Sequence, residues 1–102
     1  MTSTIIIMNY PHYATMRFDV EDIVIKEIKE QHVIMSFWVE NRDEYLKALK
    51  GLFSRQWYAR DIADYYYIKV DNSKYISGYL IGYHIDVTDD KIYLHIELVE
   101  KF

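Results

Sequence analysis

The sequence predicts an α+β domain of two similar three-stranded antiparallel β halves, related by a pseudo-two-fold axis and linked by a short central helix. Apolar and polar residues alternate in the first and last thirds of the chain, which is typical of strands that bury one face. In the middle, apolar residues recur at helical spacing. Both ends share one order of elements, so we expect a single domain over residues 1–102. Its parts are half one at 4–40, the helix and connector at 41–63, and half two at 64–100.

Half one begins with a short apolar strand over residues 4–9, which ends before Pro11 because proline fixes φ and donates no ladder hydrogen bond. A long strand starts near Arg17, and a third strand is predicted over residues 33–40. These two strands form a hairpin. The inward positions of the third strand are Val33, Met35, Phe37 and Val39.

A helix is predicted after half one, with Asn41 as a favourable N-cap. Asp43 and Glu44 lie in the first turn, where carboxylates interact favourably with the helix dipole. We expect the helix to break near Gly51, within residues 51–54, and a short second turn to follow. A helix that continues towards Ile62 is the alternative. The apolar face consists of Leu46, Leu49, Leu52 and Phe53.

Half two has the clearest alternation in the chain. A strand over residues 65–70 is followed by a turn at 71–73, where Asp, Asn and Ser favour turn conformations. A hairpin with its turn at residues 89–90 comes next and is predicted to have one apolar and one polar face. Its inward positions are Tyr79, Ile81, Tyr83, Ile85, Val87, Ile92, Leu94, Ile96 and Leu98.

The two halves are interpreted as an internal repeat. Residues 4–40 align without gaps with residues 64–100 in the order of their elements. Shortening the shift by one residue after the middle strand also aligns the inward positions of both hairpins, which requires a β-bulge near Lys26 and Glu27. The alternative is that the match arises by chance, because any two β-meanders of similar length align in this way through the two-residue period of their strands. From a true repeat we expect a groove between the halves and strand edges with unpaired N–H and C=O groups.

Composition excludes several classes of function. The chain has 102 residues, a net charge of −4 and no cysteine, which excludes disulfides, a thiolate metal site and a cysteine nucleophile. No apolar run is long enough for a membrane helix or a signal peptide. The sequence has no phosphate loop, nucleophile elbow or glycine-rich fingerprint. We therefore expect a soluble intracellular protein that is not an enzyme and needs no cofactor.

A metal site is the one catalytic route that the sequence suggests. The last hairpin pairs His84 with His95 on its outward face, beside Asp86 and Glu97, and two imidazoles with a carboxylate can bind zinc. The same residues also fit the polar outer face of a hairpin whose other face is in the core. We expect the second arrangement and assign no metal.

A basic segment at residues 47–60 is the strongest signal for nucleic-acid binding. It interleaves cations with aromatic rings, the groups that contact phosphates and stack on bases. The negative net charge argues against this function, which is the alternative to the leading hypothesis. The cations are Lys47, Lys50, Arg55 and Arg60, and the rings are Phe53, Trp57 and Tyr58.

Protein or peptide binding in the groove between the halves is the leading hypothesis. An extended segment can pair with a free strand edge while aromatic pockets select its side chains. Half one also carries apolar residues at the outward positions Val24, Ile34 and Trp38, which the helix or a partner must cover. Tyrosine and tryptophan are favoured in interfaces. The predicted peptide-binding residues are Tyr10, Trp38, Trp57, Tyr65, Tyr66 and Tyr67.

The short chain is rich in isoleucine, tyrosine, lysine and glutamate, with an apolar run at residues 4–8 and three consecutive tyrosines at 65–67. In these features and in its two-halved pattern it resembles small proteins of filamentous viruses that infect the hyperthermophilic archaeon Acidianus. The resemblance implies a viral protein in the cytoplasm of an infected host cell. It implies no activity and no catalytic or binding residue.

Overall fold

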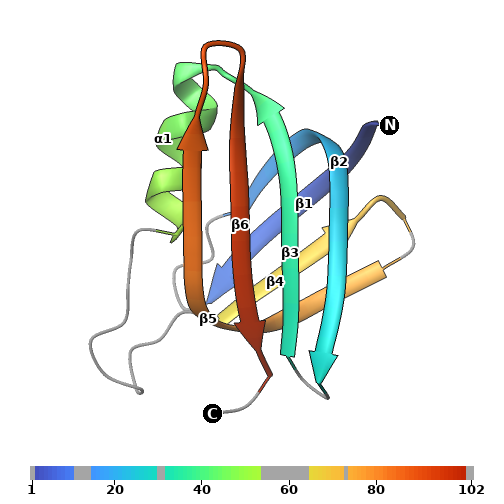
Figure 1. Cartoon of the computed structure of the whole chain (residues 1–102). Helices are drawn as coiled ribbons and strands as arrows, with labels where there is room; N and C mark the ends of the chain where they lie inside the picture. The colour runs from blue at the N-terminus through green and yellow to red at the C-terminus, as the bar shows by residue number, and fades with distance from the viewer. Residues whose placement is uncertain (1, 11–14, 30–31, 54–64, 73, 101–102) are drawn as a thin grey trace.

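A computed structural model gives the structure of residues 2–10, 15–29, 32–53, 65–72 and 74–100. Within these ranges every strand is antiparallel to its neighbours, and the strands close into a barrel in the order β1-β2-β3-β6-β5-β4 (Figure 1). The described elements are β1 (Thr2–Tyr10), β2 (Thr15–Lys29), β3 (His32–Glu40), α1 (Asp43–Phe53), β4 (Tyr65–Val70), β5 (Lys74–Val87) and β6 (Lys91–Val99).

The predicted fold class is wrong: the protein is a mostly-β closed barrel, not an α+β fold with two separate halves. Each half does form an antiparallel meander, β1 to β3 and β4 to β6, in the predicted order. The halves are not separate because their outer strands pair with each other, β1 with β4 and β3 with β6. These pairings satisfy backbone groups that two separate sheets would leave exposed.

Each half has one long strand that bends to pair with two neighbours. The first part of each long strand pairs with the preceding strand, and the rest pairs with the following one. In β2, residues 15–21 pair with β1 and residues 21–29 pair with β3. In β5, residues 74–79 pair with β4 and residues 79–87 pair with β6. The register shifts at both bends, between Glu21 and Val24 and between Leu80 and Gly82. Such bulges bend a strand around a barrel corner.

The bend in β2 lies earlier than the predicted bulge. Asp22 has a φ of 52°, in the left-handed region that aspartate tolerates better than β-branched residues do. A further register shift between Glu27 and Lys29 lies beside the predicted position at Lys26 and Glu27. The sequence therefore indicated an irregular β2 but missed its main bend.

Alternate residues of all six strands point into the barrel and form its core. Of the inward positions predicted for β3, Met35, Phe37 and Val39 are buried, and Val33 is half-buried at the strand's beginning. Burying one such side chain contributes about 1.5–3 kcal/mol relative to leaving it exposed. The largest fully buried side chains are Tyr66, Phe18, Phe37, Phe53, Ile5, Ile7, Met35, Leu49, Ile68, Ile92, Leu94 and Ile96.

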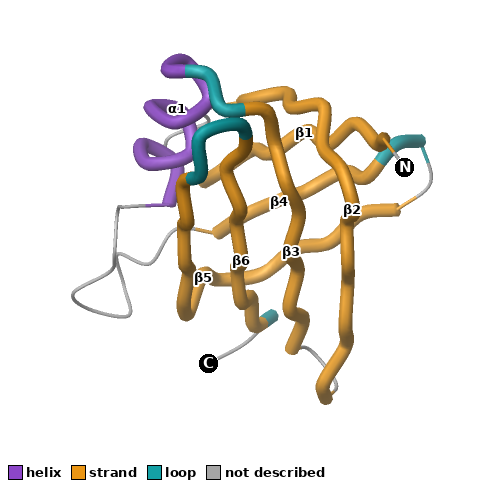
Figure 2. Tube along the Cα trace, turned by 45° about the horizontal axis from the view of Figure 1, so that its top comes forward, coloured by secondary structure: helices purple, strands orange, loops and turns teal. Residues whose placement is uncertain are grey.

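The helix α1 closes one corner of this barrel beside the upper part of β5 (Figures 1 and 2). Its apolar face buries Leu49, Leu52 and Phe53. The Phe53 ring stacks on Tyr66, with 5.1 Å between ring centroids, and the Tyr66 hydroxyl donates a hydrogen bond to the Leu52 carbonyl. At the other end of the helix, Tyr45 meets the buried Phe18 ring edge to face at 5.5 Å.

The start of α1 differs from the predicted one. Asn41 is not the N-cap: its Nδ2 donates to the carbonyl of Thr88 at 2.7 Å, and the Arg42 carbonyl accepts the bond from the Leu46 N–H. Asn41 therefore ties the start of the helix to the β5–β6 turn. The described helix ends at Phe53, within the residues 51–54 predicted for its end, and the predicted second turn lies outside the described residues.

Because β2 and β5 do not pair with each other, the barrel has two corners where these strands diverge. At one corner, residues 15–20 of β2 pair only with β1 and residues 80–87 of β5 pair only with β6, and α1 lies beside this part of β5 (Figure 2). At the other corner, residues 24–29 of β2 pair only with β3 and residues 74–78 of β5 only with β4. We call this second one the open corner.

Candidate functional site

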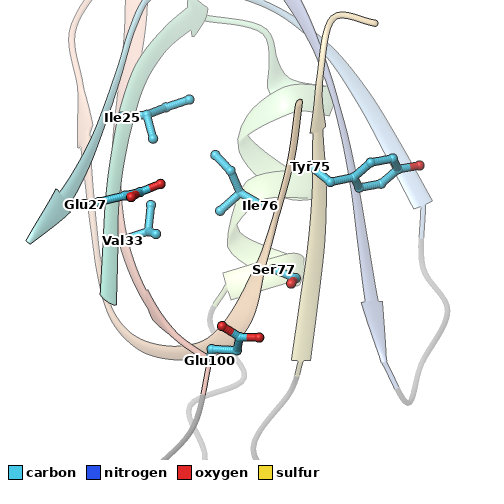
Figure 3. Close-up of a pocket in the computed structure, with 7 residues that line it drawn as sticks. All are labelled: Ile25, Glu27, Val33, Tyr75, Ile76, Ser77 and Glu100. Atoms are coloured by element: carbon cyan, nitrogen blue, oxygen red, sulfur yellow. The ribbon is translucent and has the colours of Figure 1, made fainter. Parts of the chain in front are cut away.

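A cavity of about 230 Å³ lies at the open corner, between the end of β2, the beginning of β3 and the beginning of β5 (Figure 3). Both halves of the chain contribute to it. Its described lining residues are Ile25, Glu27, Val33, Tyr75, Ile76, Ser77 and Glu100.

The inner wall of the cavity is apolar. Ile25 and Val33 point from β2 and β3 towards Ile76 on β5, across the cavity (Figure 3). Ile76 is only 5% exposed, whereas Ile25 and Val33 are half-buried. The ring of Tyr75 points away from the cavity (Figure 3). The wall therefore continues the barrel core to the surface and can take an aliphatic group.

Two carboxylates form the rim of this apolar wall. Glu27 and Glu100 follow the inward alternation of β2 and β6, at the point where each strand leaves the barrel, and both are exposed. No basic residue is among the described lining residues, and no described ion pair includes either glutamate. These two carboxylates place negative charge over an apolar floor, an arrangement that favours a cation carried on an aliphatic chain.

Strand edges flank the cavity on both sides. Residues 24–29 of β2 and 74–78 of β5 have a described strand partner on one side only. In an antiparallel ladder alternate residues direct their N–H and C=O groups to the same side. Every second residue of these segments therefore directs its backbone groups away from the paired strand, where an added strand can bind.

A group of tyrosines on the outer face of β4 and β5 adjoins the cavity. Tyr65 meets Tyr67 and Tyr79 edge to face, with ring centroids 5.0 Å and 4.8 Å apart. The Tyr65 hydroxyl donates to the Oγ of Ser77, a cavity residue, at 3.2 Å. We call Tyr65, Tyr67 and Tyr79 the tyrosine surface. This surface offers aromatic rings for contact with a partner next to the cavity, because Tyr65 contacts the cavity residue Ser77.

The predicted peptide-binding tyrosines are separated by the strand alternation. Tyr65 and Tyr67 face outward, and Tyr67 is 40% exposed. Tyr66 is fully buried in the core, so its predicted binding role is wrong. Tyr10 pairs with Tyr65 in the β1–β4 ladder. The sequence did not single out Tyr79, which the bulge in β5 turns outward.

The two predicted tryptophans do not join this site. Trp38 lies on the outer face of β3, where its ring packs on Tyr93 of β6 at 4.8 Å between centroids. Trp57 lies outside the described residues. The outward Val24 is 46% exposed, and α1 packs at the opposite corner, where Tyr45 contacts Phe18 in the first part of β2. Of the two covers expected for the outer face of half one, the helix does not shield Val24.

The basic segment is described only in part. Lys47 and Lys50 are exposed on α1, whereas Arg55 and Arg60 lie outside the described residues. Nucleic-acid binding through residues 47–60 stays a prediction that the described geometry neither supports nor opposes.

The histidines of the β-hairpin pair as predicted. His84 lies opposite His95, His84 Nε2 is 2.8 Å from Asp86, and His95 Nε2 is 3.5 Å from Glu97. His32 of β3 approaches the other oxygen of Glu97 at 3.7 Å. Among the described residues, no three such side chains are arranged to hold a metal ion.

Sequence reasoning missed Glu27 as a site residue, and Glu100 as well. The signal was present in the alternation: Ile23, Ile25 and Glu27 share the inward face of β2, just as Glu100 follows Ile96 and Leu98 in β6. A charged residue at the next inward position marks a point where the barrel interior meets solvent.

Comparison with known proteins adds no family. No protein-family model matches the chain, and no curated protein matches it significantly. The resemblance to archaeal viral proteins therefore stays a prediction. No helix in the described ranges is both long enough and apolar enough to cross a membrane.

Proposed function

We propose that the protein is a non-enzymatic binding module that takes an extended segment of a partner protein at the open corner. One observation carries the proposal: a cavity of about 230 Å³ opens between two strand segments that each have a described partner on one side only. We place the binding site, which was predicted in a groove between the halves, at this corner.

The backbone supplies the affinity in this proposal. An extended segment lying along residues 74–78 of β5 forms main-chain hydrogen bonds with the outward-directed N–H and C=O groups, as in strand addition. Alternate side chains of the segment then point into the cavity or away from it. Those that point away reach the tyrosine surface, where aromatic rings bury much area at low entropic cost.

On the resemblance alone, we propose that the partner is a viral or host protein and that binding takes place in the cytoplasm of an infected host cell. The chemistry of the corner does not depend on this origin.

The experiment is a selection of random twelve-residue peptides on the immobilised protein, followed by affinity measurements with two variants. Val33→Phe fills the cavity, whereas Ile34→Phe adds the same ring on the outward face of the same strand. We expect Val33→Phe to abolish detectable binding and Ile34→Phe to leave it within about twofold, since surface changes away from a site have small effects.

Equal binding by both variants would place the peptide elsewhere and refute the proposal. A salt-dependent gel shift with single-stranded DNA that is lost in Lys47→Ala/Lys50→Ala would instead support the nucleic-acid alternative. Circular dichroism of each variant establishes that it is folded.

A further inference from the structure

The cavity at the open corner combines an aliphatic wall with a rim of two carboxylates, and this combination specifies its occupant. Lysine and arginine are the side chains that carry a cation on an aliphatic stem, and they bury the stem while keeping the charge at the surface. The wall of Ile25, Val33 and Ile76 matches the stem, and the rim matches the charge.

We infer that the open corner is a recognition site for a lysine or arginine side chain, with the aliphatic stem against Ile76 and the cation at the rim that Glu27 and Glu100 line. The inference rests on the proposed function and names the chemistry of the partner: a basic segment. A primary alkylammonium ion is the smallest group with the same chemistry.

The opposite corner shows that this acidic rim is not a general feature of the fold. The repeat places Val87 at the position of Glu27, and Asn41 at the position of Glu100. Asn41 binds the β5–β6 turn through its side-chain amide, and α1 closes that corner with apolar side chains. The two positions that carry carboxylates at the open corner therefore carry uncharged residues at the corner where α1 packs.

Long-range electrostatics favour the same class of partner. The net charge of −4 attracts basic segments, and the carboxylates at the cavity have no described cation to neutralise them. Charged groups in a cleft with apolar walls concentrate the field and the counter-ion. Binding should therefore weaken as salt is added.

The test is an NMR titration of the isotopically labelled full chain with n-butylammonium chloride, with neutral n-butanol as the matched probe. We expect saturable shifts of the methyl resonances of Ile25, Val33 and Ile76 with n-butylammonium. Butanol should bind about fivefold more weakly, as should n-butylammonium to the Glu27→Gln/Glu100→Gln variant. Glu40→Gln, at an exposed glutamate on β3 outside the cavity lining, is the control and should leave the affinity unchanged.

Three outcomes would overturn the inference: no shift at the cavity methyls, equal binding of butanol, or equal binding by the double variant. The proposed function fails separately. If n-butylammonium binds as expected but selected peptides ignore Val33→Phe, the cation site stands and the peptide site does not. If selected peptides lose affinity with Val33→Phe yet carry no excess of lysine or arginine, the peptide site stands and the cation site does not.

Discussion

Replacing Tyr66 with phenylalanine tests how α1 is attached to the barrel. The Tyr66 side chain is fully buried, and its hydroxyl donates to the Leu52 carbonyl in the last turn of the helix. Carbonyls in the last turn have no partner within the helix, so this bond satisfies a group that would otherwise need another donor. The substitution keeps the ring stacked on Phe53 and removes only the oxygen.

The expected cost follows from leaving a buried acceptor without its donor. Such a loss destabilises a protein by about 1–3 kcal/mol, and we expect about 1.5 kcal/mol for Tyr66→Phe. At an m value of about 3 kcal/mol/M in guanidinium chloride, the unfolding midpoint falls by about 0.5 M. Far-UV circular dichroism along a denaturant series measures this shift.

Tyr67→Phe is the matched control, because Tyr67 is the adjacent residue on the opposite face of β4 and is 40% exposed. Its hydroxyl can be solvated, so we expect a change in the free energy of unfolding within about 0.5 kcal/mol. Equal effects of the two substitutions, or a larger effect of Tyr67→Phe, would refute the assignment of Tyr66 to the interior and its bond to α1.

Two further predictions concern the barrel itself. In Gly78→Ala the new Cβ would lie 2.9 Å from the Val99 carbonyl oxygen, so thermal unfolding should show a loss of about 1–3 kcal/mol in the free energy of unfolding. The control Gly82→Ala, with open space around the new Cβ, should be neutral or slightly stabilising. Equal effects of the two substitutions would contradict the close packing of β5 on β6. The Lys91 ammonium lowers the pKa of Glu21 through a hydrogen bond and its charge, so the stabilisation from this carboxylate is present at neutral pH and lost as pH falls below about 4.3. Glu21→Gln should therefore lower the melting temperature slightly at pH 7 but not at pH 2.5, and an equal loss at both pH values would show that the ion pair is not the cause.

The strands of the barrel were predictable because their side chains alternate with a period of two. The strand predicted over residues 65–70 corresponds to β4, and the inward positions Met35, Phe37 and Val39 are buried as predicted. Period alone fixes which face of a strand is buried wherever no extra residue interrupts the ladder.

Faces were mispredicted where a bulge interrupts the alternation. Tyr79 and Ile81 were predicted to face inward with Tyr83, but the register shift between Leu80 and Gly82 makes Leu80 the buried residue. The same shift turns Tyr79 outward onto Tyr65. A one-residue bulge reverses every side chain on one side of it and has no unambiguous signature in a single sequence.

Barrel closure could not be predicted because it depends on long-range pairing. The pairs β1–β4 and β3–β6 join strands that lie far apart in the sequence. Neither sequence segment of a pair indicates which distant strand it will pair with. The candidate site inherits this difficulty. Glu27 and Glu100 line one cavity only because the segments that carry them meet at one corner of the barrel, and each alone is typical of a solvated carboxylate.

Amide hydrogen exchange at the open corner tests the central claim most directly. In the free protein, alternate amides of residues 24–29 and 74–78 should exchange rapidly while those paired with β3 and β4 are protected. Adding a selected peptide should protect the rapidly exchanging amides of at least one segment. Protection of all these amides in the free protein, or peptide-induced protection confined to α1 or to the outer face of β3, would contradict the account.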